Sequence, residues 1–363
     1  MKFGILNVFD AEGRPPAEVF GQALEQYAFA DEQGWDYAWV AEHHFTWEYG
    51  ILTNPATMLA ALARETKRMR LGSAIVILPF HDPIRVAEDF ALVDHLSDGR
   101  IDLGVGRGYQ KPEFDGFGIP LAESTARFDD ALEIIRRAWS GKAFSFEGAF
   151  HRVPEVTLIP APLQQPHPPI WVAGQSPETM QKVAAMGLNL ITGQNVGFRQ
   201  FKQWVSEYRE ALVHHGHDPA TREVAVSRFL YVTDDPKADI EAEAGPYLQR
   251  YWEAVAHQVA SALEEDIPEE YKHHADGWRH LQNTAFGPLA ARYLVAGTPD
   301  QVVGQLQALR DELGATQIIC QAAFGGIPHD RALRTIELTA KDVMPRFQAD
   351  TAQAAPQTAA VGA

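Results

Sequence analysis

Residues 1–40 read MKFGILNVFDAEGRPPAEVFGQALEQYAFADEQGWDYAWV, and this stretch sets the pattern of the chain. It predicts a strand over Lys2–Asn7, a helix over Pro16–Gln33 with proline in its first turn, and a strand over Tyr37–Val40. A strand, a helix and a strand at this spacing are typical of a βαβ unit, whose two strands lie parallel. The opening of the chain therefore predicts the α/β fold class.

Short β-rich runs and longer amphipathic runs alternate along the rest of the chain. Strands are predicted at eight places: Lys2–Asn7, Tyr37–Val40, Arg70–Leu78, Ile101–Val105, Ile170–Ala173, Asn189–Thr192, Val224–Val232 and Gln317–Gln321. Helices are predicted over Pro16–Gln33, Pro55–Thr66, Pro83–Leu96, Glu123–Trp139, Phe198–His214 and His329–Val343, with one more opening at Pro177. Eight strands with intervening helices predict a closed (β/α)8 TIM barrel. A doubly wound open sheet is the alternative.

Two segments depart from this alternation. Phe144–Pro160 alternates in polarity and carries Gly148 at a turn position, so it predicts a β insertion. His257–Pro288 is irregular and lies within an acidic stretch too long for one crossover, so we expect a mobile lid before the last strand. We expect residues 1–347 to form a single barrel domain, and the small, polar residues 348–363 to form a disordered tail.

The composition of the chain argues against a nucleic-acid partner and against a membrane partner. The chain has 31 Lys and Arg against 48 Asp and Glu, and its formal net charge of −17 argues against a nucleic-acid partner. No apolar stretch approaches the ~18 residues that span a bilayer, and the first residues lack a signal-peptide pattern. We therefore expect no membrane partner and a cytoplasmic location. The one cysteine, Cys320, lies in an apolar run and is expected to be buried and unreactive.

A histidine pair follows the second predicted strand, in the sequence Glu42-His43-His44. Residues after the strands of a (β/α)8 barrel form its carboxyl-end rim, where active sites are built. Imidazole titrates near neutral pH, so a histidine beside an acid can transfer protons. The pair could instead lie on the surface or bind a metal, but the sequence has no second clear cluster of ligands. The motif therefore favours catalysis over metal binding.

Two further motifs follow later strands and suit a phosphate group. Arg107 lies between Gly106 and Gly108, where a ligand can approach the backbone closely and a guanidinium can bind a phosphate. Ser176 is a predicted N-cap with Pro177 as the first helical residue, and a helix N-terminus presents free N–H groups to an anion. Each motif alone could be a plain turn or a plain capped helix. Together, on neighbouring rim loops, they could hold one phosphate between them.

Short motifs spread along the chain resemble the bacterial luciferase family, and in particular its catalytic alpha subunits. They are MKFG at residues 1–4, AEHHF at 41–45, NP at 54–55, VAED at 86–89, LSDGR at 96–100, GRG at 106–108, VAGQSPET at 172–179 and DVMP at 342–345. The likeness covers nearly the whole chain, and the combination of motifs is more specific than any one of them.

This resemblance implies a (β/α)8 barrel enzyme that binds reduced FMN delivered by a separate flavin reductase. In such an enzyme the reduced flavin reacts with O₂ at its C4a carbon, and the resulting peroxide oxygenates an organic substrate. The chain is therefore expected to be a two-component monooxygenase acting on a small organic molecule. We also expect it to form a homodimer.

The resemblance also implies a set of site residues. His43 would be the catalytic histidine beside the flavin, and His44 its supporting neighbour. The residues expected to bind the cofactor are Glu42, Ala74, Ile75, Gly106, Arg107, Gln175, Ser176 and Thr179. Of these, the residues expected around the phosphate are Arg107, Gln175, Ser176 and Thr179. The bond between Ala74 and Ile75 matches a position where the family has a non-proline cis peptide against the flavin ring.

Two positions depart from the family pattern. Gly106 stands in place of a reactive cysteine, so thiol sensitivity is not expected there. Gln175 stands in place of a glutamate, which removes a negative charge from the phosphate site.

Two alternative functions remain open beside this prediction. An oxidoreductase using the deazaflavin F420 is one alternative, although that branch usually lacks the tandem histidines. The other alternative is a non-catalytic partner subunit. In the luciferase family that subunit resembles the catalytic one but lacks the first histidine and the phosphate arginine. This chain keeps both, as His43 and Arg107.

Overall fold

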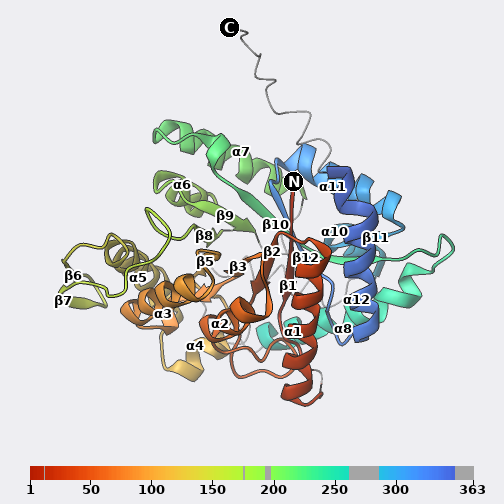
Figure 1. Ribbon diagram of the computed structural model, residues 1–363, viewed down its shortest axis with the longest axis horizontal. Coiled ribbons are helices and arrows are strands. Elements are labelled where there is room, and N and C mark those ends of the chain that lie inside the picture. Colours follow the sequence, from red (N-terminus) through yellow and green to blue (C-terminus); the bar gives the residue numbers. More distant parts are fainter. Residues whose placement is uncertain (12, 175, 193–197, 261–285, 348–363) are drawn as a thin grey trace, which may run out of the picture.

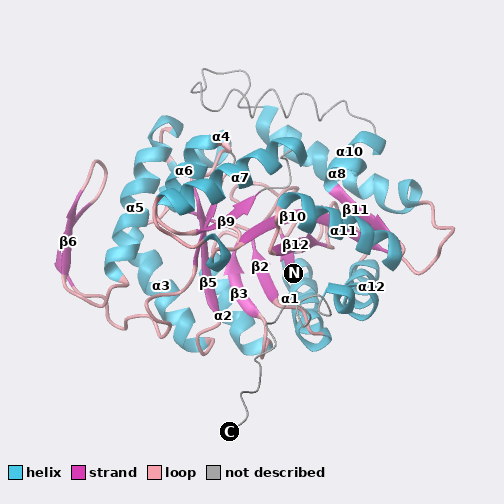
Figure 2. Ribbon diagram, turned by 90° about the horizontal axis from the view of Figure 1, so that it is seen from above, coloured by secondary structure: helices cyan, strands magenta, loops and turns pink. Residues whose placement is uncertain are grey.

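The computed structural model describes residues 1–11, 13–174, 176–192, 198–260 and 286–347, and shows a ring of parallel strands enclosed by helices (Figures 1 and 2). The strands of the ring are β1 (Lys2–Asn7), β2 (Tyr37–Val40), β3 (Arg70–Ser73), β5 (Ile101–Gly106), β8 (Ile170–Ala173), β9 (Asn189–Thr192), β10 (Val224–Val232) and β12 (Gln317–Gln321). Each of these strands pairs with the next, and β12 pairs with β1, so the sheet is closed. The predicted barrel is confirmed, and the open doubly wound sheet is wrong.

Helices at the predicted places connect the strands. They are α1 (Pro16–Gln33), α2 (Pro55–Glu65), α3 (Pro83–Leu96), α5 (Ser124–Ala138), α6 (Pro177–Ala185), α7 (Phe198–His214) and α12 (His329–Leu338), the last continued by the π-helical turn η5 (Thr339–Val343). Proline begins α1, α2, α3 and α6, because its fixed φ suits the first turn and its missing N–H costs nothing there. None of the helices among the described residues is long and apolar enough to cross a membrane.

Several elements differ from the prediction. The third strand is broken at Ala74 and Ile75 into β3 and β4 (Val76–Ile77), followed by the 3-10 turn η1 (Leu78–Phe80). One short α-helix and two 3-10 turns fall in segments expected to be loops. The helix is α4 (Lys111–Phe117), and the turns are η2 (Leu121–Glu123) and η3 (Pro219–Thr221). Among the described residues, four elements lie between β10 and β12: α8 (Ile240–Ala260), α10 (Phe286–Tyr293), β11 (Leu294–Gly297) and α11 (Pro299–Leu313). Strand β11 pairs with Phe229–Val232 of β10, whereas β12 pairs with residues 225–229 of β10, so Phe229 has a partner on both strands.

The two predicted insertions have different outcomes. The β insertion is an antiparallel hairpin of β6 (Phe144–Glu147) and β7 (Arg152–Val156), which lies at the edge of the molecule (Figure 2). The expected lid lies mostly outside the described residues, since 257–260 end α8, 286–288 begin α10, and 261–285 are not described. The expected tail, 348–363, also lies outside them, so the division into domain and tail stays a prediction.

Large aromatic side chains fill the inside of the ring. Trp39 and Trp171 are fully buried, and their rings pack edge to face with centroids 5.4 Å apart. Glycines on the facing strands make room for them, because a Cβ at Gly72 would collide with the Trp39 indole. Cys320 on β12 is buried and free, as expected, and burial raises the pKa of its thiol. The interior of the barrel is therefore packed core.

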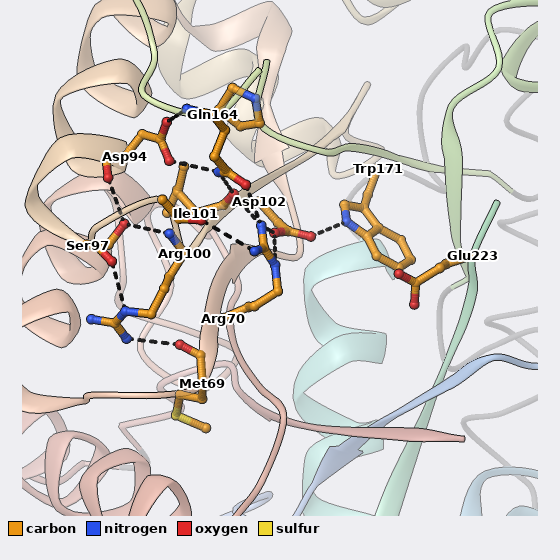
Figure 3. Close-up of polar contacts among 12 residues, drawn as sticks. Met69, Arg70, Asp94, Ser97, Arg100, Ile101, Asp102, Gln164, Trp171 and Glu223 are labelled. Carbon is orange, nitrogen blue, oxygen red and sulfur yellow. Dashed lines mark hydrogen bonds and ion pairs between the residues drawn. The ribbon is translucent and has the colours of Figure 1, made fainter. Parts of the chain in front are cut away.

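The amino ends of β3 and β5 carry a polar network (Figure 3). Asp102 accepts hydrogen bonds from Arg70 Nε at 2.7 Å and from Trp171 Nε1 at 2.7 Å. Arg70 also donates to Gln164 Oε1 at 2.9 Å. Burial raises the pKa of Asp102 to about 6, although Arg70 acts to lower it. The network ties β3, β5 and β8 together at this end.

The LSDGR motif lies beside this network and has a structural role. The guanidinium of Arg100 donates to the carbonyl oxygens of Ala63, Thr66 and Met69 at 2.9–3.1 Å. Those carbonyls belong to the end of α2 and to the loop that leads into β3. Arg100, which directly precedes β5, therefore holds the start of β3 beside the start of β5. This motif therefore supports the barrel at the end opposite the rim.

Candidate active site

A cavity of about 930 Å³ lies at the carboxyl ends of the strands, within the size range of ligand pockets. Predicted site residues from four rim segments line it together: Glu42, His43, Ala74, Ile75, Gly106, Arg107, Ser176 and Thr179. His44 does not line the cavity, and Gln175 lies outside the described residues. The rim motifs, far apart in sequence, thus meet at one place.

His43 is held by a buried carboxylate that the sequence did not reveal. Its Nδ1 lies 3.2 Å from Oε1 of Glu113, and the same oxygen accepts the backbone N–H of His44 at 3.0 Å. Glu113 belongs to α4 and is only 1% exposed. Because a carboxylate only accepts hydrogen bonds, this contact places a proton on Nδ1. Nε2 of His43 is then the nitrogen that can accept a proton from a ligand.

The neighbouring histidine points elsewhere. Nε2 of His44 lies 2.8 Å from Oε1 of Glu42, and Nε2 of His81 lies 2.7 Å from the same oxygen. The other oxygen of Glu42 accepts the backbone N–H of Ile77 at 3.1 Å. Burial acts to raise the pKa of Glu42, but the hydrogen bonds from the two histidines hold it below its usual value. The ring of His44 therefore fixes Glu42. Only the backbone N–H of His44 shares a partner with His43, and that partner is Glu113.

One end of the cavity has the groups that bind a phosphate. Arg107 Nη1 donates to Thr125 Oγ1 at 2.6 Å. Ser176 caps α6, its Oγ accepting the N–H of Thr179 at 3.3 Å, so the first turn of α6 faces the same cavity. Lys182 lies on α6 too, in an ion pair with Asp129. A guanidinium, hydroxyls and a helix N-terminus on two neighbouring rim segments fit a phosphate group.

The wall next to this end is apolar and narrow. The bond between Ala74 and Ile75 is cis, as the resemblance implied, and both residues line the cavity. A Cβ at position 106 would lie 2.2 Å from Cδ1 of Ile75, so a cysteine here, as in the family pattern, would require the Ile75 side chain to shift. Small and aliphatic groups here suit the face of a flat ring. These residues fit a flavin whose phosphate lies toward Arg107.

Three tyrosines that the sequence did not single out line the same cavity: Tyr49, Tyr109 and Tyr251. The hydroxyls of Tyr49 and Tyr109 lie 3.0 Å apart, and the Tyr49 ring packs on His43 with centroids 4.2 Å apart. Tyr251 comes from α8 and packs on Tyr49 at 5.6 Å. Burial raises the pKa of all three, so they stay protonated near neutral pH. No spacing along the sequence links these residues, since the fold alone brings them together.

A closed parallel barrel with a cavity at its carboxyl-end rim defines the class of the TIM-barrel proteins. Among the described residues, no group of three or more His, Cys, Asp or Glu side chains could hold a metal ion. The sequence model of the luciferase-like monooxygenases matches residues 1–317. The chain therefore belongs to the luciferase-like monooxygenase family, and the resemblance noted from its motifs is confirmed.

Individual relatives support the same assignment. The crystal structure of monooxygenase RslO1 from Streptomyces bottropensis superposes with a TM-score of 0.82 at 30% identity, covering 96% of this chain and all of that one. The oxygenase component of the flavin-dependent trigonelline monooxygenase of Acinetobacter baylyi is 27% identical, covering 91% of this chain and 90% of its own length. An F420-dependent secondary alcohol dehydrogenase superposes with a TM-score of 0.75 at 17% identity, covering 94% and 98% of the two chains. At that identity the last likeness shows the shared fold alone.

Proposed function

We propose that this chain is the oxygenase component of a two-component monooxygenase, which uses reduced FMN and O₂ to oxygenate a small organic substrate. A separate flavin reductase would supply the reduced FMN, as the name of the trigonelline relative suggests by analogy. The observation that carries the proposal is the cavity itself, because Arg107, the first turn of α6 and His43 all line it. The proposal also includes a cytoplasmic location and a homodimer, and light scattering of the purified protein tests the homodimer.

The phosphate end would hold and orient the cofactor. Arg107, Ser176 and Thr179 would bind the FMN phosphate, with Gln175 as a further expected contact. Ala74, Ile75 and Gly106 would pack against the flavin ring. When bound, reduced FMN supplies the two electrons that let one atom of O₂ enter the substrate while the other leaves as water. The protein contributes binding, orientation and a site for proton transfer.

His43 would move a proton at the other end of the cavity. Its Nδ1 is occupied by Glu113 at 3.2 Å, so Nε2 is the atom that accepts or returns the proton. Glu113 acts through His43 and is a positioning residue. The tyrosines around His43 narrow this end and reduce access of water, which favours oxygen transfer over release of peroxide.

Binding of reduced FMN and reduced riboflavin tests the phosphate assignment. A charge-assisted contact to the phosphate should make FMN bind roughly 10- to 100-fold tighter than riboflavin. Arg107→Met should remove most of that difference, whereas Arg85→Met, at an exposed position on α3, should leave it unchanged. Equal affinity of the unchanged protein for the two flavins would refute the assignment. Reduction of F420 by the protein, with no affinity for FMN, would favour the F420 alternative.

Oxygenation itself is tested with photoreduced FMN and ¹⁸O₂. Candidate compounds are incubated with the protein, and incorporation of one labelled atom is followed by mass spectrometry. A compound found in this way then serves as the substrate for the variants described below.

A further inference from the structure

The loop after β12 lies against helix α8. Gly325 in this loop has a φ of 55°, in the left-handed region, and a Cβ there would collide with the backbone oxygen of Tyr247 on α8. Because the neighbour is backbone, no side-chain rotation could relieve the collision. Glycine at position 325 therefore lets the helix approach the loop closely.

Two hydrogen bonds hold the same junction. Nη1 of Arg250 on α8 donates to the carbonyl oxygen of Gly325 at 3.1 Å. The next backbone N–H, that of Gly326, donates at 2.8 Å to Oδ2 of Asp10, a buried residue in the loop after β1. The loop after β12 is thus tied to the barrel, and α8 is tied to that loop.

Helix α8 carries the position of this junction to the cavity. Tyr247 and Tyr251 are four residues apart and lie on the same face of the helix, so a shift at one of them also moves the other. The ring of Tyr251 packs on Phe229 of β10 with centroids 4.8 Å apart. Phe229 also packs on Phe324, the residue before Gly325, at 5.0 Å. The place of Tyr251 in the cavity therefore depends on how closely α8 docks.

Tyr251 is connected in turn to the imidazole of His43. Its ring packs on Tyr49 with centroids 5.6 Å apart, and Tyr49 packs on His43 with centroids 4.2 Å apart. Glu113 holds the imidazole at Nδ1, and a contact at one atom leaves the tilt of the ring free. The ring of Tyr49 limits that tilt because it packs against the imidazole.

We infer that Gly325 is a positioning residue for His43. It lets α8 dock on the loop after β12, which places Tyr251 against Tyr49, and Tyr49 then sets the orientation of the imidazole in the cavity. This inference rests on the proposed function, since it concerns the step that His43 carries out. A misplacement of about 1 Å at a reacting group can lower a rate by about 100-fold, so a shift of α8 should appear in kcat.

Hydrogen exchange followed by mass spectrometry tests the connection without turnover. In Gly325→Ala we expect faster exchange both in α8 and in residues 43–52, and unchanged exchange in β5. Gly141→Ala is the matched control, because Gly141 has a φ of 70° and, its chain neighbours aside, no described residue comes within 4 Å of a Cβ there. The control should change neither segment. Faster exchange in α8 alone would overturn the inference.

Kinetics with a substrate found by ¹⁸O₂ labelling assign the effect to Tyr251. Gly325→Ala should lower kcat by roughly 10- to 100-fold and leave the affinity for FMN within about twofold. Tyr251→Leu should lower kcat by a similar factor. The double variant should lose no more than Tyr251→Leu alone, because both changes break the same contact. Losses that multiply in the double variant, or an unchanged kcat in Gly325→Ala, would show that Gly325 does not act through Tyr251.

Arg250→Met is a milder variant that serves if Gly325→Ala does not fold. It removes the hydrogen bond to the carbonyl oxygen of Gly325, so it should raise exchange in the same two segments and lower kcat by about threefold. Arg85→Met, at an exposed position on α3, should change neither. Unchanged exchange in residues 43–52 of Arg250→Met would contradict the inference. Failure of the unchanged protein to bind FMN would instead count against the proposed function, and hydrogen exchange would still decide whether Gly325 positions His43.

Discussion

The two ends of the barrel both bury carboxylates, but in opposite electrostatic situations. At the amino end, burial raises the pKa of Asp102 to about 6 in spite of the adjacent Arg70. At the carboxyl end, Glu42 is equally enclosed, yet hydrogen bonds from His44 and His81 hold its pKa below the usual value against the effect of burial. One carboxylate therefore tends toward its neutral form on folding and the other toward its charged form.

The surroundings of these groups also differ. Both oxygens of Asp102 are bonded within the protein, to Arg70 and Trp171, in a region that does not line the cavity. The rim opens instead on a cavity, which His43, Arg107 and the first turn of α6 line. A closed network stabilises the fold, whereas polar groups that face a cavity can bind a ligand. Changes at the amino end should therefore alter stability, and changes at the rim should alter the rate.

The largest effect is expected for His43→Ala. Loss of a group that transfers a proton should lower product formation by roughly 10²- to 10⁴-fold. The free energy of unfolding and the affinity for FMN should stay close to those of the unchanged protein, as measured by urea titration and equilibrium dialysis. Unchanged turnover would remove His43 from the mechanism.

At the opposite end, Arg70→Met should act on stability alone. It leaves the buried carboxylate of Asp102 without its cation, at a cost of about 2–4 kcal/mol in the free energy of unfolding at pH 7. Arg85→Met, which removes an exposed ion pair with Glu88, is the matched control and should cost less than about 1 kcal/mol. Turnover per folded molecule should be unchanged. A loss of rate in Arg70→Met without a loss of stability would contradict the division between the two ends.

Glu113→Gln should produce a smaller loss of rate than His43→Ala. An amide can occupy the same space, but it no longer fixes the proton on Nδ1 of His43, so we expect kcat to fall by about 10- to 100-fold. The Km for the substrate and the affinity for FMN should change little, because Glu113 acts through His43. Glu113→Asp, which keeps the charge, should recover part of kcat. An equal loss in both variants would point to a purely structural role.

The smallest effect concerns pH. The folded-state pKa of Asp102, about 6, lies above its value of about 3.9 in an unfolded chain, so the folded protein holds this proton more tightly. Its contribution to stability is fully present below about pH 4 and is lost as the pH rises through about 6. Urea titrations at several pH values should show that the stability of the unchanged protein relative to Asp102→Asn falls over this window. A difference that rises with pH would mean that Arg70 outweighs burial.

Most of the barrel could be predicted from the sequence because its strands are short apolar runs and its helices begin at proline or at a capping residue. Strand β11 was missed, since four residues between two helices carry little signal. Helix α8 was missed because it has an acidic start and contains Pro246, which together resemble a loop.

The site was predictable only in part. The rim motifs stand directly after strands, so Glu42, His43 and Arg107 could be found from position and chemistry. Glu113 could not, because it lies 70 residues from His43 and sits in a short helix with Pro112 and Gly116.

The pairing of β11 has a consequence for how the enzyme can diversify. The chain leaves β10 after Val232 and returns in β11 alongside Phe229–Val232 of that same strand, while closure of the ring depends on β12. The segment between β10 and β11 is thus attached at both of its ends to β10. The entropic cost of closing such a loop grows only slowly with its length. It nevertheless delivers Tyr251 and Trp252 to the cavity. Changes in the sequence of this segment can therefore alter which substrate the enzyme binds, while the barrel and the phosphate end of the cavity stay the same.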